Sequence, residues 1–222
     1  MAVNGVAGRK AGQSALSHTA RIVADGIAAH PHVEALRLGS GAGHAQALTD
    51  LVHLLSKLYG QYPGLVDLAL ASATGPTRAW LERAARGFEQ ERMFVVRLTA
   101  AVGPIPSTPG AAHTESAVAG QRHALETLAR SERRGCALGA AVALLCDWRT
   151  VRPLLDRAAE RIGTASPVAE LPDDNSIDGA VGLLADEVAA QRAVGFGSEQ
   201  LLLQHRSLFD LLEARAEARQ AI

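Results

Sequence analysis

A regular repeat of apolar residues three and four positions apart is the feature that most constrains this sequence. It is clearest between residues 44 and 59, where Asp50 and His53 fall on the opposite, polar face. The apolar positions are Leu48, Leu51, Val52, Leu55, Leu58 and Tyr59. This spacing follows the 3.6-residue period of an α-helix, so the segment is predicted to be an amphipathic helix with one buried face.

The composition indicates that the rest of the core is helical as well. Apolar residues make up 48% of the 222 residues but aromatic residues only 4%, so the core consists mainly of Ala, Leu and Val. Strands favour β-branched and aromatic residues, whereas these residues suit closely packed helices. We therefore expect an all-α protein, a bundle of about six or seven helices, with one domain over residues 14–222 and a disordered segment over residues 1–13.

The turn-forming residues divide the chain into helical segments. The expected helices cover residues 14–29, 44–59, 65–72, 76–102, 112–147, 148–162, 177–194 and 198–218, with the 112–147 segment interrupted at most at Gly135. Residues 103–111 carry three prolines and form a rigid turn. The helices on either side, 76–102 and 112–147, are expected to pack as a long antiparallel hairpin at the centre of the bundle.

Charge and hydropathy limit the partners and the compartment. The formal net charge of −1 provides no field that would collect nucleic acid or an anionic membrane. The opening residues contain no apolar segment typical of a secretory signal, and the longest apolar run, Cys136 to Cys146, is far short of the roughly 20 residues that span a bilayer. We expect a cytoplasmic protein with both cysteines buried and reduced.

Two pairs of residues have the helical spacing of a metal site. Asp50 and His53 form one pair, and His123 and Glu126 form the other. Ferritin-like proteins bind two irons through Glu-x-x-His pairs that point into a bundle core. Here the helical wheel places both pairs opposite the apolar stripe, so we expect them to be solvated and predict no metal.

Five polar residues lie on faces that should be buried, and they are the candidate site residues. They are Glu91, Arg92, Gln121, Glu132 and His205. A polar group on a core face needs a partner or a function. In the antiparallel hairpin, Glu91 would lie beside Gln121 or Arg122. Glu132 would lie level with Ala84 and Ala85, where it could act with His205 as acid and base or simply hold a neutral histidine in place.

Two further patterns have a structural explanation. Asp173, Asp174 and Asp178 resemble an Asp-rich magnesium motif, but they directly precede a helix, where acidic residues and caps are favoured. Gly135 and Gly139 are spaced four apart with Ala143, which allows a neighbouring helix to approach closely. We interpret the first pattern as helix capping and the second as packing.

Several strings resemble a family of uncharacterised all-helical proteins from sphingomonad-type α-proteobacteria. They are LYGQYPG, AAVGPIPSTPG, GQRHALE and SERRGCALGAAVALLCDWR, and the resemblance covers most of the chain from about residue 40 onward. The family carries no assigned activity. The resemblance implies a bacterial cytosolic setting and leaves the function open.

Two functional hypotheses remain. The first is a non-catalytic helical protein that binds a partner protein or a small apolar ligand, because no nucleophile motif occurs and the interior is rich in alanine. The alternative is a ferritin-like or haem-oxygenase-like enzyme that uses iron or manganese, with ligands drawn from Glu91, Glu132 and His205. The regular leucine stripes would also suit self-association into a homodimer.

Overall fold

The structure is a computed structural model that describes residues 19–221, and every regular element within them is helical. Residues 19–25 are helical, and the elements that follow are η1 (Ile27–Ala29, a 3-10 helix), α2 (Pro31–Leu38), α3 (Gly41–Tyr59), α4 (Leu65–Ser72), α5 (Pro76–Ala101), α6 (Ala111–Ala129), α7 (Cys136–Arg161), α8 (Asp174–Gly182) and α9 (Val188–Gln220). The prediction of an all-α fold is confirmed, with more helices than the six or seven expected. The segment expected to be disordered, residues 1–13, lies outside the described residues.

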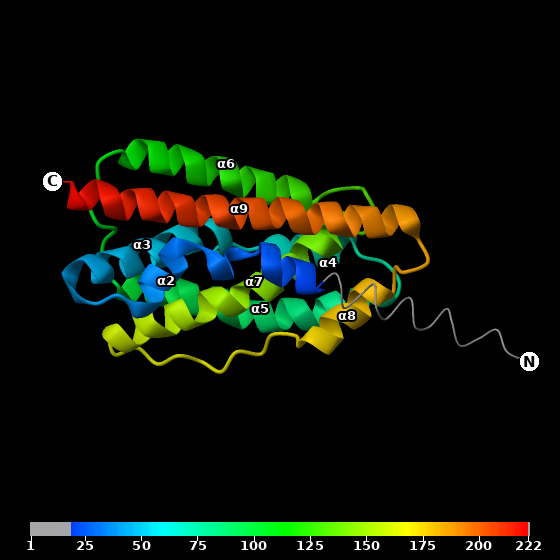
Figure 1. Cartoon of the computed structure of the whole chain (residues 1–222). Helices are drawn as coiled ribbons and strands as arrows, with labels where there is room; N and C mark the ends of the chain where they lie inside the picture. The colour runs from blue at the N-terminus through cyan, green and yellow to red at the C-terminus, as the bar shows by residue number, and fades with distance from the viewer. Residues whose placement is uncertain (1–18, 222) are drawn as a thin grey trace, which may run out of the picture.

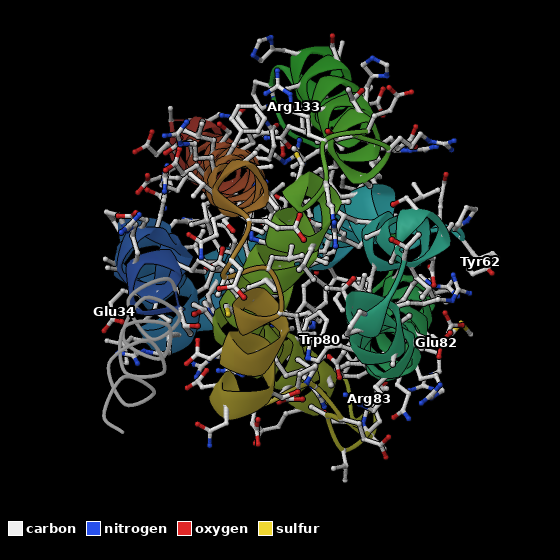
Figure 2. The ribbon with its side chains drawn as sticks, turned by 90° about the vertical axis from the view of Figure 1, so that its right-hand side faces the viewer. Glu34, Tyr62, Trp80, Glu82, Arg83 and Arg133 are labelled. Carbon is white, nitrogen blue, oxygen red and sulfur yellow. The ribbon has the colours of Figure 1, made fainter. Side chains whose placement is uncertain are left out.

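Helix α7 is the centre of the bundle. Figures 1 and 2 show it running through the middle of the molecule with the other long helices around it. Its first half, Cys136 to Cys146, is apolar on every side and entirely buried. A helix that is apolar all round must be covered on all sides, so this stretch determines where its neighbours lie.

Helices α7 and α9 pack backbone against backbone. A Cβ atom added to Gly139 would lie 2.0 Å from the carbonyl oxygen of Val194, and one added to Gly197 would lie 2.0 Å from that of Cys136. The Ser198 hydroxyl donates a hydrogen bond to the carbonyl of Gly139 at 2.9 Å. The predicted close approach at Gly135 and Gly139 is thus confirmed, and its partner is α9.

The predicted central hairpin is wrong in both its boundary and its partner. The helix expected over residues 112–147 ends at Ala129, and α7 begins at Cys136 and runs without a break through Asp147 and Trp148. Gly135, the residue before α7, has φ of 97°, a left-handed conformation that favours glycine. Helix α6 packs against α3, α4, α7 and α9, whereas α5 packs against α3, α4 and α7.

The two ends of the chain also differ from expectation. Residues 14–18 of the helix predicted over residues 14–29 lie outside the described residues; the helix over residues 19–25 ends in a bend at Gly26. Helix α2 begins at Pro31, because proline suits the first turn of a helix. Ile22 and Ile27 in this region are buried, whereas Val23 is 55% exposed. The two helices expected at residues 177–194 and 198–218 are instead a short α8 and one α9 of 33 residues.

The acidic cluster before α8 caps that helix, as predicted. Asp173 Oδ1 accepts a hydrogen bond from the backbone N–H of Ser176 at 2.7 Å. Trp80 on α5 then fixes α8 in place by donating its Nε1–H to the Ser176 hydroxyl at 3.0 Å, and Figure 2 shows Trp80 between these two helices.

Among residues 19–221, no helix is both long and apolar enough to cross a membrane.

Candidate functional site

A chain of three buried polar side chains crosses the core. Tyr59 on α3 lies 2.5 Å from His205 Nε2 on α9, and His205 Nδ1 lies 2.6 Å from Asp147 Oδ2 on α7. The second oxygen of Asp147 accepts the backbone N–H of Ile27 at 3.0 Å. An ionised carboxylate can only accept hydrogen bonds, so His205 donates one to Asp147 through Nδ1–H. Its Nε2 atom then accepts a hydrogen bond from the Tyr59 hydroxyl.

Burial keeps the Tyr59 phenol protonated. Desolvation raises the pKa of Tyr59 well above its usual value, and the nearby Asp147 carboxylate adds to the effect. The phenol therefore stays protonated and donates to His205 at neutral pH. All three side chains have hydrogen-bond partners, and their hydrogen bonds hold α3, α7 and α9 together.

Glu91 is completely buried and pairs with α7. Its carboxylate accepts the indole N–H of Trp148 at 2.9 Å and the guanidinium of Arg152 at 2.6 Å. Arg152 also stacks over Phe94 and donates to Asp156. The predicted neighbours of Glu91, Gln121 and Arg122, are replaced by Trp148 and Arg152, because α5 packs against α7 rather than α6.

Aromatic rings join these two networks. Trp148 lies edge-to-face with Tyr59, with ring centroids 5.5 Å apart, and with Phe88 at 4.9 Å. Tyr59 also meets the His205 ring at 5.7 Å. The Tyr59 and Glu91 networks thus share a single aromatic cluster in the middle of the bundle.

The remaining core-face candidates do not converge on these networks. Arg92 pairs with Glu89 and lies over the ring of Tyr62 at 5.3 Å. The Gln121 amide donates to the carbonyl of Gln204 at 3.4 Å. Glu132 is exposed in the loop between α6 and α7, so its predicted place on a core face is wrong; the helix that would have carried it inward ends at Ala129.

The predicted solvation of Asp50 is also wrong. Asp50 is fully buried, and its carboxylate accepts hydrogen bonds from Arg215 at 2.8 Å and from Arg219. Thr108 accepts from both guanidiniums as well. The polar face of α3 is covered here by the end of α9, which turns a surface position into a buried ion cluster.

His32 borders this cluster and should make stability depend on pH. Burial first, then the charges of His30 and Arg219, lower its pKa to about 4. The unfolded chain therefore binds more protons between pH 6.5 and 4, and the free energy of unfolding should fall by about 3 kcal/mol across that window.

Denaturant unfolding of wild type and His32→Gln at several pH values checks this expectation. The variant should lose less stability than wild type as the pH falls from 6.5 to 4. His123→Gln, at an exposed position on α6, is the matched control and should follow wild type. Parallel curves for wild type and His32→Gln would contradict the account.

The other three candidate metal ligands, His53, His123 and Glu126, share no hydrogen-bond partner within residues 19–221. His53 Nε2 lies 2.8 Å from the carbonyl of Gly103, and Glu126 accepts from Arg122 at 3.0 Å. His123 is exposed, as predicted. His53 is on α3 and the other two are on α6, and the three do not form a shared ligand set.

One group of residues within the described part has the geometry of a metal site: His30, Asp210 and Glu213, whose ligand atoms lie within 4.8 Å of one another. His30 Nδ1 accepts the backbone N–H of His32 at 3.1 Å, so the ring proton is on Nε2, where it faces Asp210 at 3.1 Å. A metal-bound histidine normally donates its second nitrogen. This arrangement therefore fits a helix cap with a hydrogen bond from His30 to Asp210 better than a metal centre.

The cysteines offer no nucleophile. Both are buried on α7, as predicted. Burial raises the pKa of Cys146 to about 12, so its thiol is protonated at neutral pH.

A partly open cavity of about 290 Å³ lies where α3, α4 and α6 meet, and we call it the Tyr59 pocket. Its lining residues are Leu58, Tyr59, Gln61, Tyr62, Pro63, Gly64, Leu65, Leu68, Arg122, Leu125, Glu126 and Arg130. Leucines from three helices form its apolar walls, and Tyr59 connects it to the buried chain. Its volume is near the lower end of the range for small-molecule sites.

Three other hollows are lined by no residue of the buried Tyr59–His205–Asp147 chain. A second cavity, of about 260 Å³, lies at the start of α7 and includes Glu132 and Leu81. Two open grooves follow the surface, one beside Arg157 and Pro167 and the other between Gly26 and Leu203. The Tyr59 pocket alone among these four borders the Tyr59–His205–Asp147 chain, so we treat it as the candidate site.

Sequence reasoning missed Tyr59, Asp147, Arg152 and Arg215 as members of buried networks. A continuous helical wheel through α7 would have placed Asp147 and Arg152 on buried faces, but the expected break at Trp148 concealed this. Arg215 and Arg219 stand four apart in a charged run that is typical of a solvated helix end.

Comparison with known proteins supports the expectation of a family without assigned activity. No curated protein and no solved structure matches the chain. A family model described as "Family of unknown function (DUF6975)" matches residues 22–220, which is most of the sequence. The chain therefore belongs to this family of unknown function.

Proposed function

We propose that this protein is a non-catalytic helical binding protein that holds a small ligand with an apolar body in the Tyr59 pocket. The observation that carries the proposal is the pocket itself: a partly open volume of about 290 Å³ with Leu58, Leu65, Leu68 and Leu125 among its lining residues. Burial of such a ligand among leucine side chains would provide the main driving force.

The state of the ionisable core groups supports binding over catalysis. Glu91 uses both oxygens on Trp148 and Arg152, and His205 uses both nitrogens on Tyr59 and Asp147. A general acid or base must reach a substrate, whereas these groups already face one another in the interior. The metal-dependent alternative needs Glu132 beside Glu91 and His205, and Glu132 is in an exposed loop.

The proposal includes a cytoplasmic setting. It includes no nucleic-acid partner, because the formal net charge of −1 provides no field that would collect nucleic acid. It favours a small molecule over a partner protein because a cavity of about 290 Å³ has the size of a short chain or a ring.

Calorimetric titration with octan-1-ol, a neutral ligand with an apolar chain, tests the proposal. Wild type should bind it with Kd below about 1 mM, which corresponds to about 4 kcal/mol of binding free energy. Leu68→Trp places an indole in the pocket and should weaken binding at least about tenfold. Leu183→Trp makes the same change at an exposed position outside the pocket and should bind as wild type does.

Circular dichroism of each variant confirms that it is folded before titration. Absence of saturable binding to wild type, or equal binding by wild type and Leu68→Trp, would overturn the proposal.

A further inference from the structure

Two arginines and one glutamate are the charged residues that line the Tyr59 pocket. Arg122 Nε donates to Glu126 Oε1 at 3.0 Å, so these two charges neutralise each other. Arg130 follows the last residue of α6, and no carboxylate within residues 19–221 pairs with it. The pocket therefore carries one uncompensated positive charge at its α6 side.

The residues behind the pocket wall do not change this balance. Arg92 lies over the ring of Tyr62, which lines the pocket, but it is already paired with Glu89. Lys57 on α3 pairs with Glu115 at 3.4 Å. The charge of Arg130 is thus the one left for a ligand, beside apolar walls from Leu65, Leu68 and Leu125.

We infer that the ligand of the Tyr59 pocket is an amphipathic anion, a small molecule with an apolar body and one carboxylate-like group that pairs with Arg130. This inference rests on the proposed function and names the chemical class of its ligand. Arginine matches a carboxylate in geometry because its planar fork can donate two parallel hydrogen bonds. The apolar body then occupies the leucine-walled part of the cavity.

Arg130 also has a purely structural explanation, since a cation at the end of α6 is favoured by the helix dipole. That role would affect the stability of the helix but not the preference between a charged and a neutral ligand. A matched pair of ligands separates the two.

The test compares octanoate with octan-1-ol, which share an alkyl chain and differ in the charged head. Wild type should bind octanoate about tenfold more tightly than octan-1-ol in low salt, and 0.5 M NaCl should reduce that preference. Arg130→Gln should bring the two affinities to about the same value while leaving octan-1-ol binding unchanged.

Arg133→Gln is the matched control. Arg133 is in the same loop and is also exposed, but it stacks over Phe196 and does not line the Tyr59 pocket. Figure 2 shows Arg133 and Tyr62 on separate sides of the molecule. This variant should keep the full preference for octanoate.

The outcomes distinguish the inference from the proposed function. If neither ligand binds to wild type, the proposed function fails and the inference fails with it. If octan-1-ol binds as well as octanoate, or if Arg130→Gln keeps the preference, the ligand is not an anion held by Arg130 and the proposed function stands.

Discussion

Replacement of Gly139 by alanine should destabilise the protein by at least about 3 kcal/mol. The new Cβ would lie 2.0 Å from the carbonyl oxygen of Val194 and 2.8 Å from its Cα. Because these are backbone atoms of α9, no side chain can rotate away to make room. Helices α7 and α9 would have to separate, and the Ser198 hydrogen bond to the Gly139 carbonyl would weaken with them.

The same substitution at Gly195 provides the control. Gly195 is also within α9, but an added Cβ there meets nothing within 4 Å. Gly195→Ala should leave the protein unchanged or stabilise it by up to about 1 kcal/mol, because alanine favours the helix. Chemical denaturation of both variants checks the pair. A Gly139→Ala protein as stable as wild type would show that α7 and α9 do not pack this closely.

Replacement of Asp50 by asparagine should cost about 3 to 5 kcal/mol of unfolding free energy. Asp50 is the acceptor for Arg215 at 2.8 Å and for Arg219, and all three side chains are almost completely buried. Asparagine keeps the shape of the side chain and removes its charge. Two guanidiniums would then stay in the interior without a counter-ion among residues 19–221.

Asp210→Asn is the matched control on α9. Asp210 pairs with His30 at 3.1 Å, but its side chain is 71% exposed, so its loss should cost about 1 kcal/mol or less. Equal stabilities for the two variants would contradict the buried cluster. Arg215→Met combined with Asp50→Asn should recover part of the loss, because it removes one of the orphaned charges.

The helices that could be predicted from sequence are those whose pattern is complete within one segment. Helix α3 follows its leucine stripe, and α5 begins at Pro76 and ends within one residue of the expected boundary. The Asp173 cap was predictable because a cap is a local interaction between residues three apart. The apolar run at Cys136 likewise indicated a buried helix.

The boundaries that failed depend on tertiary contacts. Residues 130–135 form a non-helical connection between α6 and α7, although their charged and polar side chains would also suit the surface of a helix. Gly195 and Gly197 weaken α9 locally, yet the helix continues because Gly197 allows close packing on Cys136. The packing that offsets the helix-weakening effect of these glycines comes from α7, and the sequence of α9 alone does not show it.

The buried Asp50 cluster and the candidate site were hidden for a related reason. A helical wheel places Asp50 opposite the leucine stripe of α3, and only the arrival of α9 in the fold buries it with Arg215. The walls of the Tyr59 pocket come from α3, α4 and α6, none of which carries a recognisable motif. His205 and Glu91 were identified as buried polar residues, whereas their partners on α7 were not.

The central claim is that the Tyr59 pocket is where a small ligand binds. Its most direct test is an octan-1-ol titration followed residue by residue in ¹H–¹⁵N correlation spectra of the wild-type protein. The account predicts saturable shifts concentrated at residues 58–68 and 122–130, which surround the pocket. Saturable shifts confined to the groove between Gly26 and Leu203, or to the surface beside Pro167, would contradict it.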